Sequence, residues 1–467
     1  MAEKEQGALA GADEALELPA QYSEERLAAE YTRLHGDDWK YVAEFSKWLL
    51  WDGFRWRPDL TLRHFDLARE LARHVSAHAY EDPQLSRSQQ KRIGFVIGSA
   101  KTVAAIERLA RADRGHAMPA EAFDKYPMMS NTPTGVLDLT SGQLYERDKS
   151  YFLTKSTGAG LGDKCPTWFK FIERVTGGDR ELAKFLQRFA GYCLTGDTSS
   201  HALLFLFGLG ANGKSTFANA LIGALGDYAT TAPTDMFVES FTARHPTELA
   251  RLRAMRLVVV QEVEDGQRWA TAKIKQLTGG DRVTAHFMRQ DYFEYTPQFK
   301  LLFCGNHKPS LRTVDEAIRR RFFLVPFTVT IPPDERDPEL STKLRAEWGG
   351  ILRWALEGCL EWREIGLAPP EAVRNATDLY MGDEDLIGGW MNECCEQEPR
   401  AFVPVAELHQ SYQTWAERAG EKFFGQKRFS QVIEDHGYER ARDSSSRIRG
   451  FRGLRLRRAQ ERLEAIP

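Results

Sequence analysis

The residues best suited to chemistry lie where an apolar run gives way to a helical pattern. GLGANGKS, at Gly208–Ser215, follows the apolar run Leu203–Phe207 and precedes the helical pattern Thr216–Leu225. It fits the spacing G-x-x-x-x-G-K-[S/T] of phosphate-binding loops. Glycines let such a loop curl so that its backbone N–H groups point inward, and the following helix adds partial positive charge at its N-terminus. The segment therefore predicts a site for a nucleoside triphosphate.

Two side chains of this loop have expected roles. We expect Lys214 to reach the β and γ phosphates, and the Ser215 hydroxyl to bind Mg²⁺. The residues expected to contact the nucleotide are Gly208, Leu209, Gly210, Ala211, Asn212, Gly213, Lys214, Ser215 and Thr216.

Polar side chains also follow two later apolar runs. RLVVVQEVEDG, at 256–266, carries Glu262 and Glu264, and KLLFCGNHKPS, at 300–310, carries Asn306. Ligands of parallel α/β sheets bind at the carboxyl ends of the strands, so we expect these side chains near the loop. Glu262 is the expected metal ligand beside Ser215, one glutamate is expected to polarise the attacking water, and Asn306 is expected to sense the γ phosphate.

Two further segments carry positive charge. VDEAIRRRFFLVPF, at 314–327, places three arginines, Arg319–Arg321, before an apolar run, and in an oligomeric ATPase such an arginine reaches a neighbour's γ phosphate. A solvated, salt-bridged helix end is the alternative. KQLTGGDRVTAHFMRQDYFEYTP, at 275–297, predicts a hairpin in which His286 and Arg289 grip a nucleic-acid backbone.

Composition sets the class of protein. The 467 residues are 42% hydrophobic and 28% charged, with a net charge of −3, so nucleic acid must be contacted through local patches. The six cysteines lack zinc-ligand spacing. Neither a signal peptide nor a long apolar span is evident, which favours a reduced cytoplasmic compartment and no membrane contact.

The expected fold class is α/β, with a parallel P-loop sheet between smaller domains. Aromatic residues around Asp52–Gly53 predict a hairpin, whose small hydrophobic core we favour over stacking on nucleic acid. The arginine-rich stretch 436–458 leaves DNA or partner recognition and a solvated strand pair equally open. The expected divisions are a disordered tail at 1–20, a helical region with the hairpin at 21–120, a meander with helices at 121–197, the P-loop domain at 198–345, a helical region at 346–395 and a basic domain at 396–467.

The order of these motifs resembles that of the superfamily 3 helicases. GLGANGKS, VVVQEVED, LTGGD, LLFCGNHKP and DEAIRRRFFLVPF follow one another as in the phage and plasmid primase–helicase C-terminal branch, which poxvirus primase–helicases share. The resemblance spans about residues 30 to 457. It implies a modified AAA+ core, an N-terminal helical and α+β domain, and a small C-terminal domain of winged-helix type.

The resemblance also implies an activity. Members are hexameric rings that hydrolyse ATP with Mg²⁺, translocate on single-stranded DNA and unwind forked duplex during replication. It assigns the finger to Arg320 or Arg321, and the DNA-contacting region to Lys275 with the hairpin bearing His286 and Arg289. Glu262 and Glu264 replace the paired aspartates of other members.

We therefore expect a replicative DNA helicase of a phage, plasmid or integrated element. The alternatives are an origin-binding or loader ATPase, and a nucleotide-gated scaffold that recruits a primase or polymerase. The stretch ahead of the helical domain shows no paired-aspartate metal motif, so we expect no primase activity here. Primer synthesis then belongs to another polypeptide, a separate primase or polymerase partner, or to no part of this system.

Overall fold

A computed structural model describes residues 20–239, 247–263, 267–287, 291–311, 314–421, 423–442 and 447–457. The expected tail at 1–20 lies, except for its last residue, outside these ranges, as do Glu264 and Arg289. Contacts divide the chain into two compact units. One holds the described residues up to Asp138, with Gln143–Thr157 and His286–Phe293, and the other holds the remainder.

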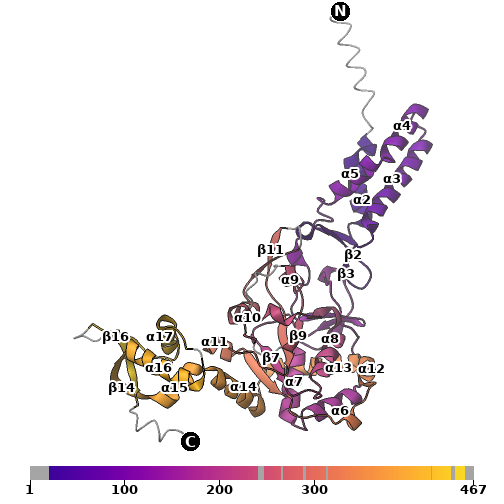
Figure 1. The fold of residues 1–467 in the computed structure, drawn as a ribbon. Helices are drawn as coiled ribbons and strands as arrows, with labels where there is room; N and C mark the ends of the chain where they lie inside the picture. Colours follow the sequence, from indigo (N-terminus) through magenta and orange to yellow (C-terminus); the bar gives the residue numbers. More distant parts are fainter. Residues whose placement is uncertain are drawn as a thin grey trace, which may run out of the picture. The chain divides into compact units, whose positions relative to one another are not determined.

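The first unit combines a helical bundle with two small antiparallel sheets. Helices α2 to α5 lie side by side (Figure 1). The bounds are α2 (Glu24–His35), β1 (Trp39–Val42), β2 (Lys47–Trp51), β3 (Trp56–Pro58), α3 (Arg63–Glu81), α4 (Arg87–Ile97), α5 (Ala100–Ala110), β4 (Met129–Thr132), β5 (Gly135–Asp138) and β6 (Leu144–Tyr145). The boundary expected at residue 121 lies inside this unit.

The aromatic hairpin belongs to the core of the first unit. Strands β2 and β3 are antiparallel, with Trp51 opposite Trp56, and Gly53 takes the left-handed φ of 85° that the turn requires. Trp48 is buried, and its indole Nε1 donates to Glu107 Oε1 at 2.6 Å. The hairpin and the core interpretation are therefore confirmed.

The second unit is built on a five-stranded parallel sheet. Its order is β13-β7-β12-β9-β8, so β12 is inserted beside the strand that precedes the glycine-rich loop. All six residues of β12 are buried, which explains its continuous apolar sequence. The strands are β7 (Leu203–Phe207), β8 (Ala229–Thr231), β9 (Leu257–Val263), β12 (Lys300–Gly305) and β13 (Phe322–Pro326). The α/β class and the parallel sheet are confirmed.

Helices cover this sheet. Along the chain, the hairpin expected at 275–297 comes between β9 and β12. The helices are α6 (Pro166–Val175), α7 (Arg180–Tyr192), α8 (Lys214–Leu225), α9 (Thr247–Ala250), α10 (Thr271–Thr278), α11 (Glu316–Arg319), α12 (Leu340–Ala346), α13 (Trp348–Ile365) and α14 (Glu371–Glu384). Strands β10 (Val283–His286) and β11 (Tyr292–Tyr295) form the two-stranded hairpin.

The end of the chain forms a smaller α/β structure within the second unit. Its elements are α15 (Leu386–Cys394), β14 (Cys395–Pro404), α16 (Val405–Ala419), α17 (Gln426–Asp435), β15 (Arg440–Arg442) and β16 (Arg449–Leu456). The antiparallel sheet has the order β14-β16-β15. Trp390, Tyr412, Phe429 and Phe451 are buried in its core.

Helices α7 and α13 meet at glycines that admit no side chain. A Cβ on Gly191 would lie 2.0 Å from the amide nitrogen of Cys359. Gly191→Ala must therefore separate the two helices, and we expect it to lower the free energy of unfolding by about 1–3 kcal/mol. The measurement is urea unfolding of the full chain.

Gly382→Ala is the matched control, because Gly382 lies in α14 with nothing within 4 Å of its added Cβ. Alanine is the better helix former, so this change is expected to be neutral or to stabilise by at most about 1 kcal/mol. Equal unfolding midpoints for the two variants would contradict the packing described.

Candidate nucleotide site

The loop after β7 has the conformation of an anion cradle. Gly210, Ala211 and Gly213 take left-handed φ values of 52°, 49° and 85°, and α8 begins directly after them. A Cβ on Gly208 would lie 2.2 Å from the carbonyl oxygen of Phe327, so the loop is pressed against the end of β13. A non-glycine residue such as Ala211 in this region stores strain of the kind found at ligand clamps.

Lys214 is the centre of the site. It is buried, and its Nζ donates to Gly208 O at 2.7 Å, to Asn212 Oδ1 at 3.0 Å and to Asn306 Oδ1 at 3.0 Å. Burial lowers the pKa of this ammonium. All three acceptors are neutral, so a buried cation is solvated without being neutralised. A buried positive charge without a negative partner favours the binding of an anion beside it.

Asn306 reaches the loop because β12 lies next to β7. It follows Gly305, the last residue of β12, and its Oδ1 also lies 3.4 Å from the backbone nitrogen of Gly210. Asn212 fixes the loop from the other side, since its Nδ2 donates to Phe327 O at 2.9 Å. The structure thus brings together Lys214 and Asn306, which are 92 positions apart.

Glu262 lies on a bulge at the end of β9. Cys304 pairs with Gln261 and Gly305 with Val263, so Glu262 is the extra residue, with a φ of 63°. Its side chain is exposed. Bulges re-aim side chains beside active sites. Its strand is separated from β7 by β12, a distance of roughly 10 Å across the sheet.

A polar pair beside this bulge was not foreseen from the sequence. Gln261 Nε2 donates to Asn219 Oδ1 of α8 at 3.1 Å, which ties the acidic strand to the helix after the loop. The interruption of the apolar run VVV by glutamine was the signal available in the sequence. Among the described residues, His, Cys, Asp and Glu form no cluster of three that would hold a metal ion.

The three arginines have different surroundings. Arg319 lies 3.4 Å from Asp378, and Arg321 is buried with its Nη1 donating to Ala317 O at 2.7 Å. Burial, followed by the charge of Arg320, lowers the pKa of Arg321. Arg320 is exposed, and within the described part of the chain it has no ion pair. Of the three arginines, Arg320 is therefore the one whose guanidinium is available to another molecule.

The arginines lie at the opposite edge of the sheet from the loop. Arg321 O accepts a hydrogen bond from the backbone nitrogen of Leu203, the first residue of β7, at 2.8 Å. The glycine-rich loop follows the last residue of the same strand. Five residues of β7 separate the two edges by roughly 17 Å.

Lys275 and His286, two of the residues expected to contact DNA, have different partners among the described residues. Lys275 of α10 forms an ion pair with Asp315, which caps α11 by accepting from Ile318 N at 2.9 Å. His286 ends β10, and its ring meets that of Tyr292 at a centroid distance of 4.7 Å. Arg289 lies outside the described residues, so the expected pairing with His286 stays a prediction.

Three family models match successive parts of the chain. Residues 24–177 match the family model described as D5 N terminal like, residues 206–321 match a family of unknown function, and residues 382–452 match the Poxvirus D5 protein-like family. The chain is a relative of the D5-type superfamily 3 primase–helicases. The resemblance inferred from its motifs is confirmed.

Individual relatives are distant. A protein of Frog virus 3 (isolate Goorha) with the provisional helicase name 022R is 26% identical over 267 residues, which are 51% of this chain and 26% of that protein. Uncoating factor OPG117 of Vaccinia virus (strain Western Reserve) is 25% identical over 222 residues, 44% of this chain and 28% of that protein. The chain spans about a quarter of the length of these relatives.

A solved structure supports the fold. The apo C-terminal region of NrS-1 aligns with a TM-score of 0.51 at 9% identity, covering 91% of this chain and 98% of that one. At this identity the likeness is one of fold. Among the described residues, no helix has the length and apolar character needed to cross a bilayer.

The different surroundings of Arg319 and Arg320 predict that substituting them has different effects on ATP hydrolysis. Arg320→Ala is expected to lower the maximal rate of ATP hydrolysis about a thousandfold, because it removes the one guanidinium of the described trio that is neither buried nor ion-paired. Nucleotide affinity, measured by titration, should be retained. Arg319→Ala is the matched control and should keep near-normal turnover. Equal losses in both variants would contradict the assignment.

Proposed function

We propose that this chain is an ATP-dependent replicative DNA helicase that works as a ring of identical subunits. The observation that carries the proposal is the Lys214 ammonium, held between the glycine-rich loop and Asn306 at the carboxyl edge of a parallel sheet. That arrangement positions a cation, an amide and backbone donors for a terminal phosphate. The D5-type relatives with helicase names support the same activity.

The residues present fit ATP and Mg²⁺. In exchange for its three neutral acceptors, Lys214 gains a charged phosphate partner, and the exposed Ser215 hydroxyl at the start of α8 is available as a metal ligand. Glu262 is the carboxylate for the same ion, held directly or through water, since Mg²⁺ takes few protein ligands beside phosphates. When bound, the ion would supply positive charge to neutralise the phosphates. Asn306 orients the attacking water.

Arg320 acts on the nucleotide of a neighbouring subunit. It lies at the edge of the sheet remote from its own loop and therefore cannot reach its own γ phosphate. We propose a closed ring of six subunits, each with an AAA+ core. In this ring, the end of the sheet that carries Arg320 in one subunit meets the end that carries the glycine-rich loop in the next subunit. Lys275, through Asp315, anchors the N-terminus of α11, which ends at Arg319 directly before Arg320.

DNA contact is proposed at the hairpin of β10 and β11, with His286 and Arg289 on a single strand. The elements from α15 to β16 are proposed to form a winged-helix domain. The proposal rests on their order along the chain, which is α15, β14, α16, α17, β15 and β16. Forked DNA is the proposed substrate, with a separate primase or polymerase as partner. The setting of a phage, plasmid or integrated element in a bacterial cytoplasm stays a prediction.

Lys214→Ala tests the mechanism on a forked duplex with single-stranded tails. We expect unwinding and ATP turnover to be lost, because the terminal phosphate loses its buried cation. Lys170→Ala, at an exposed lysine of α6, is the matched control and should unwind normally. The measurement is release of a labelled strand in the presence of ATP and Mg²⁺.

Unwinding by Lys214→Ala at the normal rate would overturn the mechanism. DNA-stimulated turnover without strand release by the unmodified protein would favour the loader ATPase. Neither turnover nor strand release would favour the nucleotide-gated scaffold.

A further inference from the structure

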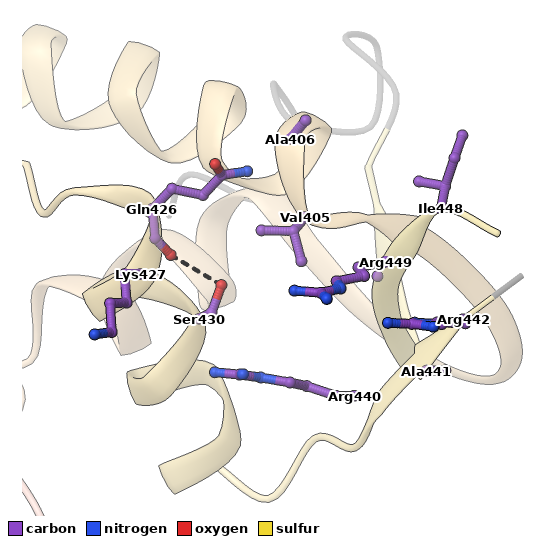
Figure 2. Close-up of a pocket in the computed structure, with 11 residues that line it drawn as sticks. Val405, Ala406, Gln426, Lys427, Ser430, Arg440, Ala441, Arg442, Ile448 and Arg449 are labelled. Atoms are coloured by element: carbon purple, nitrogen blue, oxygen red, sulfur yellow. Dashed lines mark hydrogen bonds between the residues drawn. The ribbon is translucent and has the colours of Figure 1, made fainter.

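A basic groove and an aromatic cluster lie outside the nucleotide site. The groove, of about 670 Å³, lies between α16, α17 and the strands β15 and β16, which the arginine-rich stretch forms. The cations that line it are Lys427, Arg440, Arg442 and Arg449 (Figure 2). This charge belongs to the winged-helix domain already proposed. The aromatic cluster belongs to the first unit, for which the proposed motor gives no role.

The aromatic cluster consists of Phe45, Phe287 and Phe293. The ring of Phe45 meets the ring of Phe287 edge to face at a centroid distance of 6.2 Å, and it meets the ring of Phe293 in the same way at 5.6 Å. The rings of Phe287 and Phe293 stack on each other at 5.5 Å. Edge-to-face and stacked pairs are the arrangements that aromatic rings prefer. All three side chains are half-buried.

Phe45 is held in place by the core of the first unit. It ends the short 3-10 helix Ala43–Phe45 between β1 and β2, and the next residue, Ser46, takes a left-handed φ of 50°. A non-glycine residue keeps such a conformation only where its surroundings fix it. The side chain of Phe45 packs against the buried cluster that contains Val42 and Trp56. Its ring is therefore a fixed support for whatever lies on it.

Phe287 and Phe293 lie on the two strands of the β10–β11 hairpin. Phe287 directly follows β10, and Phe293 is the second residue of β11. Contacts place His286–Phe293 in the first unit, although Ala285 and Glu294, on either side of this segment, belong to the second. The contacts of Phe45 with Phe287 and Phe293 are part of what ties the segment to the first unit.

The hairpin needs such support because its sheet has only two strands. A two-stranded hairpin alone is marginally stable in water. The aromatic cluster supports it at the end that carries His286, and Lys47 adds to this support, since its Nζ lies 5.5 Å from the centroid of the Phe287 ring. A segment that is already held in place loses less conformational entropy when it binds a ligand.

We propose that Phe45 is a positioning residue for single-stranded DNA, because its ring holds His286–Phe293 in the conformation that contacts the strand. Phe45 itself does not touch the DNA. The inference rests on the proposed function for the DNA contact of the hairpin. It goes beyond that function by giving the N-terminal unit a part in this contact, and it needs no nucleotide.

The test compares two substitutions of Phe45 by their effect on DNA affinity. Phe45→Leu keeps apolar volume against the core but removes the ring, and Phe45→Tyr keeps the ring. Binding of the full chain to a labelled oligothymidylate of about 20 nucleotides is followed by fluorescence anisotropy without nucleotide. We expect Phe45→Leu to weaken binding about tenfold, because two aromatic pairs and the support of the hairpin are lost. Phe45→Tyr should bind normally.

Phe65→Leu is the matched control. Phe65 is a half-buried phenylalanine of α3 that packs against a different core cluster of the same unit, so its substitution should leave DNA affinity unchanged. Hydrogen exchange of β10 and β11 without DNA is a second measurement, which does not depend on the proposed function. Exchange should be several-fold faster in Phe45→Leu than in the unmodified protein, and normal in Phe65→Leu.

Unchanged hydrogen exchange in Phe45→Leu would overturn the proposal, as would equal losses of DNA affinity in Phe65→Leu. Normal DNA binding by Phe45→Leu while His286→Ala binds weakly would also overturn it, and the DNA contact of the hairpin would then stand without it. If neither Phe45→Leu nor His286→Ala weakens binding, the hairpin is not the DNA contact, and this part of the proposed function fails together with the inference.

Discussion

The burial of one ammonium group among neutral oxygens is the interaction on which the rest of this structure depends. Lys214 is taken from water by α8 and the loop, and its three protons are satisfied by Gly208, Asn212 and Asn306. An uncompensated buried charge would be costly, so this geometry holds only while the loop stays curled and β12 stays beside β7. The sheet order and the left-handed loop residues therefore form one arrangement, and it is this arrangement that we propose binds phosphate.

The parallel direction of the sheet imposes the second constraint. Every strand carries its carboxyl end to the same edge, so Asn306 and Glu262 lie on the side of the loop, while the arginines before β13 lie on the other side. A single chain therefore holds both halves of the proposed catalytic arrangement, each out of reach of the other. This separation is the physical basis for proposing that neighbouring copies complete each other's sites.

Local features were predictable from the sequence, and pairings between distant segments were not. The loop, the Asp52–Gly53 hairpin and the strand of Asn306 are each set by neighbouring residues, and they were predicted. The sequence did not distinguish Arg320 from Arg321, because the difference in burial on which the proposal of Arg320 rests arises only in the folded chain. Nor did it predict the ion pair of Lys275 with Asp315, 40 positions away, or the bulge at Glu262, which arises from pairing with β12.

The central claim is that one subunit's arginine completes its neighbour's phosphate site. It is tested most directly by mixing two inactive proteins, Lys214→Ala and Arg320→Ala, and measuring ATP hydrolysis as a function of their ratio. At some interfaces an intact loop from one variant meets an intact Arg320 from the other, so we predict that turnover reappears and is greatest in mixtures. A mixture with no more turnover than either protein alone, under conditions in which the two are shown to co-assemble, would contradict the account.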